Sequence, residues 1–438
     1  MSMRRSYLNV FSILLFIAVS CSKDMNPESV PAEVDVKDTI KVMSPVPVQQ
    51  ITKVALNEVQ KGYVEAGNSM AFRFLDKMYD GKNVVCSPLS LQYALSMAAN
   101  GASGQTLHEI VDFFGYGDEG IDALNAYNKL LLEQLPAVDL DVKLKVTDAL
   151  IVNNMFPLLP SFKETVENNY YAAVDNMDFS DPDQVAARLN EWARRSTDGF
   201  IDEILKSEDI SKDAVAFIMN ALYFKAKWAD DIEPMFDERY TAQEDFTETD
   251  GNKVKLDMMR TTSWYWYAEM DGYLVLKLPF AGEKFNMYFL LPDKNDVAAL
   301  VAKLQKTSWS EITESLKNDA EVRVRIPKFN IENKTDLTKI LQSLGINKAF
   351  QSSSAEFDNM FQSDGLPFWI SKVIQKSRIS VTEWGTEAGS VTIVDMDGAA
   401  GDQPQYKIVN FNANHPFVFV IGEETSGTIL FEGVFAGK

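Results

Sequence analysis

Histidine and cysteine are scarce in this chain of 438 residues, which contains only two of each. Neither histidine stands in a catalytic pattern: His108 has a helical, surface-like context and His415 directly precedes a proline. Because there is also no Gly-x-Ser-x-Gly elbow, a Ser-His-Asp hydrolase is not expected. No zinc motif, calcium-loop spacing or phosphate loop occurs. The sequence therefore predicts no enzyme, no metal site and no cofactor.

The apolar run near the N-terminus is too short to be a membrane span. It extends from Val10 to Val19 and follows two arginines, which predicts a signal peptide over residues 1–20. Ala18-Val19-Ser20-Cys21 then resembles a bacterial lipobox, in which the cysteine is acylated. The resemblance implies membrane attachment through an N-terminal lipid, in the bacterial cell envelope at the outer membrane or cell surface. An ordinary secretory signal followed by a chance cysteine is the alternative.

The two cysteines predict no internal disulfide if Cys21 carries the lipid. Cys86 then remains alone, and it lies in the apolar run Val84-Val85-Cys86. A cysteine in such a run is expected to be a small buried hydrophobic residue rather than a nucleophile.

Positive charge is in deficit, with 42 Lys and Arg against 63 Asp and Glu. Removing residues 1–20 removes two arginines, which moves the formal net charge from −21 to −23. This acidity argues against nucleic acid and anionic membrane surfaces as partners. The proline-punctuated stretch 21–50 is expected to be the lipidated N-terminus and a flexible tether. No second linker is visible, so residues 51–438 are expected to form one large domain.

Several stretches predict the main elements of this domain. Ser87 followed by proline is a strong helix start, with Ser87 as the N-cap. Residues 141–153 alternate as a strand, interrupted only by Asp148. Residues 214–224 are nearly all apolar, which suits a strand covered on both faces, and their one strongly polar member, Asn220, needs a hydrogen-bond partner.

Further patterns predict a helix from Pro182 with an apolar stripe, a hairpin over residues 274–292, and an alternating strand over residues 322–329. A short helix closed by Gly345 follows this strand.

The most unusual segment extends from Glu383 to Pro416. It begins Glu-Trp-Gly-Thr-Glu-Ala-Gly-Ser, continues as a small-residue polar stretch, and ends in His-Pro-Phe-Val-Phe before an apolar strand. A loop of about thirty residues inside a compact domain is usually functional. Together with Asn220-Ala-Leu-Tyr-Phe-Lys-Ala-Lys-Trp228, the segment resembles the signature and reactive-centre loop of serpins. Separate motifs in the family's order extend this resemblance from about residue 65 to the end of the chain.

The resemblance implies a single α+β serpin fold. We therefore expect a large mixed β-sheet, two smaller sheets and about nine helices, in a metastable state with an exposed reactive-centre loop. We also expect a monomer.

The resemblance also implies two groups of residues that control opening of the main sheet, the shutter and the breach. They are Ser87, Ser90, Asn220, Trp228 and Gln375. The family usually has a histidine at the position of Gln375, and that histidine bonds to the asparagine matched by Asn220. Because glutamine both donates and accepts hydrogen bonds, we expect the latch to survive without its pH sensitivity.

The resemblance implies a serine-protease inhibitor that acts as a suicide substrate. A protease would cleave the loop, become acylated, and be trapped when the front half of the loop inserts into the main sheet. Small side chains are needed at the hinge for insertion, and this chain has them; the hinge comprises Glu383, Gly385, Thr386, Glu387, Ala388, Gly389 and Ser390. A non-inhibitory serpin-fold binding protein that proteases merely cleave is the alternative.

Counting along the loop places the reactive bond at Ala399–Ala400, and Met396–Asp397 is the competing choice. No Lys or Arg occurs between Arg378 and Lys407, so trypsin-like targets are not expected. Elastase-like or subtilisin-like serine proteases are the expected partners.

Overall fold

The structure is a computed structural model that describes most of the chain. The described residues are 39–43, 45, 47, 49–115, 120–229, 234–362, 366–386 and 406–438. Tertiary contacts divide the chain into two units, residues 1–38 and 39–438, and every described residue belongs to the second. The expected signal peptide and Cys21 therefore lie outside the described residues.

Part of the stretch expected to be a flexible tether, residues 21–50, packs on the folded domain. Ile40 is only 2% exposed and belongs to an apolar cluster with residues of the central sheet. Its carbonyl oxygen accepts a hydrogen bond from Arg195 at 3.3 Å. The end of the expected tether thus packs on the folded body from Thr39 onward.

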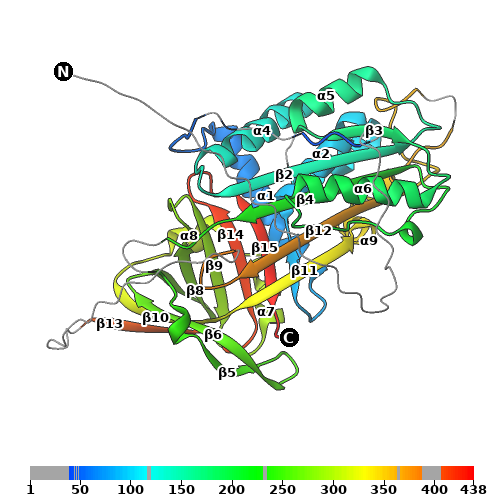
Figure 1. The fold of residues 1–438 in the computed structure, drawn as a ribbon. Coiled ribbons are helices and arrows are strands. Elements are labelled where there is room, and N and C mark those ends of the chain that lie inside the picture. The colour runs from blue at the N-terminus through cyan, green and yellow to red at the C-terminus, as the bar shows by residue number, and fades with distance from the viewer. Residues whose placement is uncertain are drawn as a thin grey trace, which may run out of the picture. The chain divides into compact units, whose positions relative to one another are not determined.

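A five-stranded mixed sheet, which we call the main sheet, organises this unit (Figure 1). Its order is β11 (Phe329–Asp336), β12 (Lys372–Val381), β4 (Ala216–Lys225), β2 (Lys143–Asn153) and β3 (Ala173–Met177). All of β4 except its last residue is buried, as its continuous apolar sequence predicts for a strand with both faces covered. Strands β12 and β4 are parallel, whereas β2 runs antiparallel to β4.

Helices cover both faces of the main sheet. Helix α6 (Pro182–Ser196) crosses one face (Figure 1), where its stripe of Val185, Leu189 and Trp192 is buried with residues of β2 and β4. It begins as the sequence predicts, because the Asp181 side chain accepts from the Gln184 N–H and proline occupies the first turn. Helix α2 (Pro88–Gly101) contacts β4 and β2, and the Ser87 side chain caps it by accepting from the Ser90 N–H.

Two further sheets complete the fold. One has six strands in the order β1-β15-β14-β9-β8-β7, and the other has four in the order β13-β10-β6-β5. The six-stranded sheet thus has more strands than the main sheet, which the sequence did not predict. The bounds are β1 Val84–Cys86, β5 Ala242–Thr247, β6 Lys253–Ser263, β7 Trp266–Met270, β8 Tyr273–Pro279, β9 Phe285–Pro292, β10 Ala320–Pro327, β13 Lys407–Asn412, β14 Phe417–Glu423 and β15 Ile429–Phe435.

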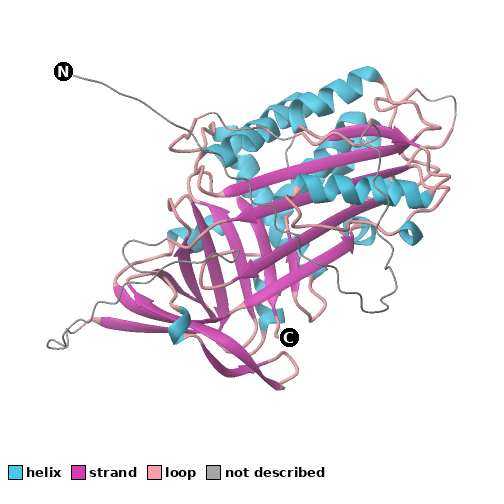
Figure 2. Cartoon of the chain, in the orientation of Figure 1, coloured by secondary structure: helices cyan, strands magenta, loops and turns pink. Residues whose placement is uncertain are grey.

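Within the described residues there are nine α-helices, most of which gather around the main sheet (Figure 2). The remaining bounds are α1 Glu58–Met78, α3 Gly104–Phe114, α4 Gly120–Gln134, α5 Pro160–Tyr170, α7 Val297–Leu304, α8 Trp309–Glu314 and α9 Thr338–Ser343. None of the helices in the described ranges is both long and apolar enough to cross a membrane. The expected α+β architecture is confirmed.

Candidate functional site

The central strands β4 and β12 are hydrogen-bonded to each other along only part of their length. Their register contains five pairs, from Lys372 opposite Phe217 to Lys376 opposite Ala221. Strand β12 continues to Val381 while still paired with β11. Among the described residues, the next bridge toward β4 is the isolated contact between Lys227 and Gly385. Between these two contacts, residues 222–226 and residues 377–384 are not paired with each other in the described structure. We call this stretch between β4 and β12 the opening.

Thr386 is anchored at the end of the opening. Its N–H donates to the Ala226 carbonyl oxygen at 2.9 Å, and its hydroxyl oxygen accepts from the Ala226 N–H at 2.9 Å. The side chain is buried, with 2% exposed. The last described residue before the expected reactive loop is thus already bonded to the chain that extends β4.

Gly385 makes this approach possible because it has no side chain. Its φ is +121°, a left-handed conformation that favours glycine. A Cβ atom at this position would lie 2.1 Å from the Ala226 carbonyl oxygen. Thr382 and Gly385 also exchange two backbone hydrogen bonds, at 2.9 and 3.2 Å, which close a tight turn. The turn and the close approach therefore both require glycine.

Two buried side chains hold the turn from either side. Trp228 donates through Nε1 to the Thr382 carbonyl oxygen at 2.8 Å and stacks on Phe280 with ring centroids 4.8 Å apart. Glu383 is ion-paired with Lys328 at 2.8 Å and accepts from the Thr241 hydroxyl at 2.7 Å. Burial raises the pKa of Glu383, but these two partners outweigh burial, so its net pKa is lowered and the carboxylate stays charged.

Phe200, in the chain that follows α6, connects the two sides of the opening. Its ring lies 5.1 Å from the ring of Tyr223 on β4. The Arg378 guanidinium of β12 lies 4.8 Å from the centroid of the same ring. A new strand entering between β4 and β12 would have to break this contact.

A polar latch lies where β4 and β12 are still paired. Gln375 is opposite Asn220 in the register, yet its side chain bonds to the backbone of Ser87 on the helix side of the sheet. Its Oε1 accepts from the Ser87 N–H at 3.0 Å, and its Nε2 donates to the Ser87 carbonyl oxygen at 2.9 Å. The Ser87 hydroxyl donates to the Leu430 carbonyl oxygen at 2.7 Å. Gln375 thus ties β12 to the start of α2.

Asn220 has a different partner from the one the sequence suggested. It was expected to bond to residue 375, but its Nδ2 donates to Oδ1 of Asp148 on β2 at 2.7 Å. The register places Asp148 opposite Asn220 on one side and Gln375 on the other. Because both ends of the Gln375 amide bond to the Ser87 backbone, Asp148 is the partner that Asn220 has. Burial raises the pKa of the Asp148 carboxyl to about 7, and the hydrogen bond from Asn220 only partly offsets this effect. Within the part of the chain that the structure describes, Oδ2 of Asp148 and Oδ1 of Asn220 have no hydrogen-bond partner.

The predicted shutter and breach residues meet in two places. Four lie in or beside the latch; they are Ser87, Ser90, Asn220 and Gln375. Trp228 lies with the described hinge residues at the end of the opening. The remaining hinge and both candidate reactive bonds lie outside the described residues; they are Glu387, Ala388, Gly389, Ser390, Ala399–Ala400 and Met396–Asp397.

The sequence reasoning missed Asp148, Phe200 and Lys328 as members of the site. Asp148 left a signal, because it alone breaks the alternation of its strand. Phe200 and Lys328 left none, since their roles depend on neighbours far away in the sequence.

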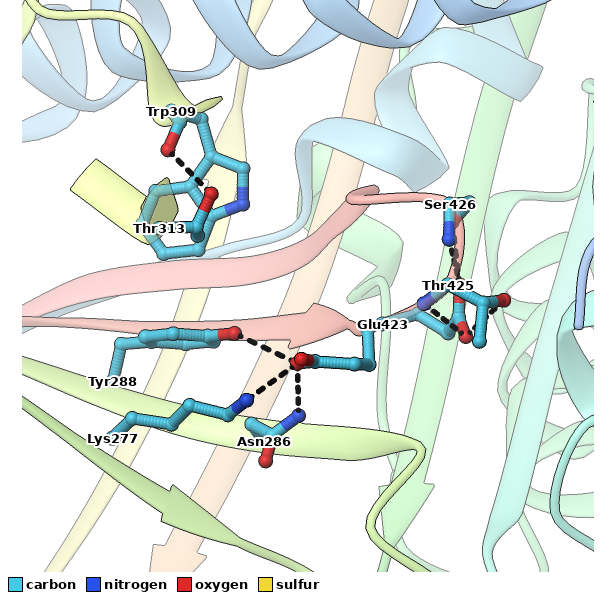
Figure 3. A network of polar contacts seen from close by, with 9 residues as sticks. Lys277, Asn286, Tyr288, Trp309, Thr313, Glu423, Thr425 and Ser426 are labelled. Atoms are coloured by element: carbon cyan, nitrogen blue, oxygen red, sulfur yellow. Dashed lines mark hydrogen bonds and ion pairs between the residues drawn. The ribbon is translucent and has the colours of Figure 1, made fainter. Parts of the chain in front are cut away.

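A separate hollow of about 250 Å³ lies between α8 and the six-stranded sheet. Trp266, Tyr288 and Trp309 line it, together with the Lys277–Glu424 ion pair at 2.7 Å. Asn286 and Tyr288 also donate to the Glu424 carboxylate. Figure 3 shows the polar network beside the hollow, in which the side chains of Lys277, Asn286 and Tyr288 converge. The hollow thus has aromatic side chains in its lining together with one lysine and three glutamates, Glu314, Glu423 and Glu424.

Comparison with known proteins places these features in one family. Residues 65–437 match the family model described as "Serpin (serine protease inhibitor)". Serpin-Z3 of Arabidopsis thaliana is 32% identical over 389 residues, which cover 84% of this chain and 96% of that protein. The crystal structure of tengpin, a thermophilic serpin in the native state, has a TM-score of 0.79 at 27% identity and covers 90% of this chain and 98% of its own. AtSerpin1 of Arabidopsis, in a native stressed conformation, has a TM-score of 0.74 at 29% identity, with coverage of 87% and 99%.

Proposed function

The chain belongs to the serpin family, and from this premise we propose that it inhibits serine proteases as a suicide substrate. A protease attacks the loop and forms an acyl-enzyme bond to the new C-terminal end of its front half. That half then enters the main sheet between β4 and β12 and carries the protease with it, so deacylation stops. The chain itself turns over no substrate in this scheme.

The anchored Thr386 is the observation that carries the proposal. It already bonds to Ala226 at the end of an opening where β4 and β12 share no ladder. A strand that continues from Thr386 would find two backbone edges to bond. About a dozen inserted residues, each gaining about 1 kcal/mol net from ladder hydrogen bonds, would together gain about 12 kcal/mol. That gain is comparable with the entire stability of an ordinary domain, about 5–15 kcal/mol.

The hinge sequence supports rapid insertion. Thr386 is buried, so a strand of period two would also point Ala388 and Ser390 inward. All three side chains are small, and none carries a charge that would have to be desolvated. Insertion can therefore compete with hydrolysis of the acyl bond.

The loop composition supports elastase-like or subtilisin-like targets. A small residue precedes the bond at Ala399–Ala400, and an unbranched apolar one precedes the alternative bond at Met396–Asp397. The absence of Lys and Arg between residues 378 and 407 speaks against trypsin-like proteases.

Complex formation with an elastase-like protease tests this function. The chain without residues 1–20 should form a covalent complex that survives SDS, and mass spectrometry should locate the cut at one of the two candidate bonds. Thr386→Arg is the matched control, because a long charged side chain in the buried position should give cleavage without a complex. Complete cleavage of the unmodified chain while the protease stays active would contradict the proposal.

We also propose that the protein is a monomer held in the bacterial cell envelope by lipid on Cys21. This proposal rests on the resemblance of residues 18–21 to a lipobox. In detergent phase separation after expression in bacteria, the full chain should enter the detergent phase. Cys21→Ser should move it to the aqueous phase, and an unchanged partition would exclude the lipid.

The hollow beside α8 favours one second candidate, a serpin-fold binding protein that proteases merely cleave. Its volume of about 250 Å³ is slightly below the range of about 300–1,000 Å³ that is usual for small-molecule sites, so only a small ligand would fit. Thermal unfolding before and after loop cleavage separates the two functions. An inhibitor should become far more heat-stable when cleaved, whereas a pure binding protein that does not insert its loop should not.

A further inference from the structure

Exposed apolar side chains gather on the four-stranded sheet, beside the point where the chain returns from the reactive loop. Trp264 is 50% exposed and Ile408 is 42% exposed. Trp264 directly follows the end of β6, which is paired with β10, and Ile408 is opposite Glu321 on the other side of β10. The register of β6 and β10 ends at Ser263, and its continuation by one residue would bring Trp264 opposite Glu321 as well. Since residues in the same row of a sheet face the same side, we expect Trp264 and Ile408 on one solvent-facing side.

Tyr406 joins these two residues and is held in place. Its ring lies 5.5 Å from the ring of Trp264. Its hydroxyl donates to the Glu321 carboxylate at 2.7 Å, and the same carboxylate accepts from Arg323 at 3.1 Å. The aromatic pair is therefore pre-organised, which lowers the entropy cost of binding a partner.

The start of β13 is also fixed from the opposite face. Lys407 is ion-paired with Glu269 at 2.8 Å, and its ammonium lies 5.2 Å from the centroid of the Tyr267 ring. Six parallel pairs with β10 then continue the strand. These contacts fix the start of β13, and with it Tyr406 and Ile408. Because β13 belongs to the four-stranded sheet, it should also stay in place when the loop enters the main sheet.

Chain length brings an attacking protease to this surface. Tyr406 lies six residues after Ala400. Six extended residues span at most about 21 Å. For the alternative bond, nine residues separate Asp397 from Tyr406 and span at most about 32 Å. A protease whose active site holds the bond at Ala399–Ala400 therefore has its own surface close to β13, and the alternative bond allows a longer reach. Trp and Tyr are also the residues that most often dominate the binding energy of protein interfaces.

We propose that Trp264, Tyr406 and Ile408 form a docking platform for the protease that attacks the loop. The proposal rests on the proposed inhibitory function and names a partner surface for it. The platform holds the protease before cleavage only. After cleavage the protease leaves with the front half of the loop, while Tyr406 stays on the body. The platform therefore sets how fast and how tightly the protease first binds, and does not contribute to the final complex.

Two measurements with the same elastase-like protease test the platform. The first is the dissociation constant of the chain for the protease with its catalytic serine replaced by alanine, which binds without cleaving. The second is the second-order rate constant for complex formation with the active protease. Trp264→Ala should raise the dissociation constant about tenfold and lower the rate constant for complex formation about tenfold. This is the size of effect expected from the loss of one important interface residue. The yield of SDS-stable complex at saturation should not change.

Met155→Ala is the matched control. Met155 is also an exposed apolar side chain, with 63% exposed, but it lies in the turn after β2, away from the four-stranded sheet. Its removal should leave both constants within twofold of the unmodified chain.

Three outcomes would overturn the platform. They are unchanged constants in Trp264→Ala, an equal loss in Met155→Ala, and a dimer of the unmodified chain in sedimentation that Trp264→Ala abolishes. Failure of the proposed inhibition itself would look different. The unmodified chain would then form no SDS-stable complex, while the binding measurement with the inactive protease would still report on the platform.

Discussion

Replacing Asp148 by asparagine should remove a large part of the pH dependence of stability. The carboxyl is buried, Asn220 is its only hydrogen-bond partner among the described residues, and burial raises its pKa to about 7. An unfolded aspartate has a pKa of about 3.9. A raised pKa means that the native state holds the proton more tightly than the unfolded state does. The stabilisation is therefore complete below about pH 4 and is lost as the pH rises through 7.

The difference of about three pKa units corresponds to about 4 kcal/mol over the full range. Between pH 5 and pH 8 the native state should lose about 2–3 kcal/mol through this one group. The groups that face Asp148 are Asn220 from β4, Tyr93 from α2 and Tyr170 from α5, and both tyrosines stay neutral because burial raises their pKa further. None of them supplies a compensating positive charge. The isosteric amide cannot ionise, so Asp148→Asn should lack this loss.

Denaturant unfolding at pH 5, 6, 7 and 8 measures the effect. Burial also raises the pKa of Glu432, to about 8, so some pH dependence should remain in Asp148→Asn. The relevant quantity is thus the difference in free energy of unfolding between the two proteins, which should grow in favour of the variant by about 2–3 kcal/mol from pH 5 to pH 8. Glu432→Gln is the matched control, and it should retain the contribution of Asp148. Parallel curves for the unmodified chain and Asp148→Asn would refute the reasoning.

Three further changes test the hinge and the opening. Gly385→Ala should lower the free energy of unfolding, measured with denaturant, by about 2 kcal/mol or more, because its Cβ would lie 2.1 Å from the Ala226 oxygen. Gly251→Ala is the control: Gly251 also has a positive φ, but a Cβ there would have no atom within 4 Å, so the same assay should show a loss of only about 1 kcal/mol. Thr386→Arg should raise the number of inhibitor molecules consumed per protease at least severalfold in a titration, and an unchanged number would mean that residue 386 does not enter the sheet. Phe200→Ala should speed the loss of inhibitory activity on warming, since the ring contacts Tyr223 and Arg378 across the opening; an unchanged rate would show that Phe200 does not hold the opening closed.

Local patterns in the sequence predicted most of the central elements. The apolar run of residues 214–224 became β4, and the alternating stretch from residue 141 became β2. The serine-proline helix start is confirmed by the Ser87 cap of α2. The hairpin and the short helix near Gly345 also formed, as β8, β9 and α9. These elements could be predicted because residue spacing and capping within one segment determine them.

Partner choice within the site could not be predicted in the same way. Asn220 bonds to Asp148, which is 72 positions away, because the antiparallel register of β2 and β4 places the two opposite each other. Gln375 is also opposite Asn220 in the register, but the Ser87 backbone at the start of α2 bonds to both ends of its amide. A single sequence shows that a buried amide needs a partner, but the register that decides which partner is a property of the assembled sheet.

The crystal structure of the chain after cleavage in the reactive loop tests the central claim most directly. Our account predicts that residues 386–394 form a new strand between β4 and β12, so that the pairing of Gln375 with Asn220 is lost. Strands β4 and β12 still paired as they are now, with the cleaved segment outside the sheet, would contradict it.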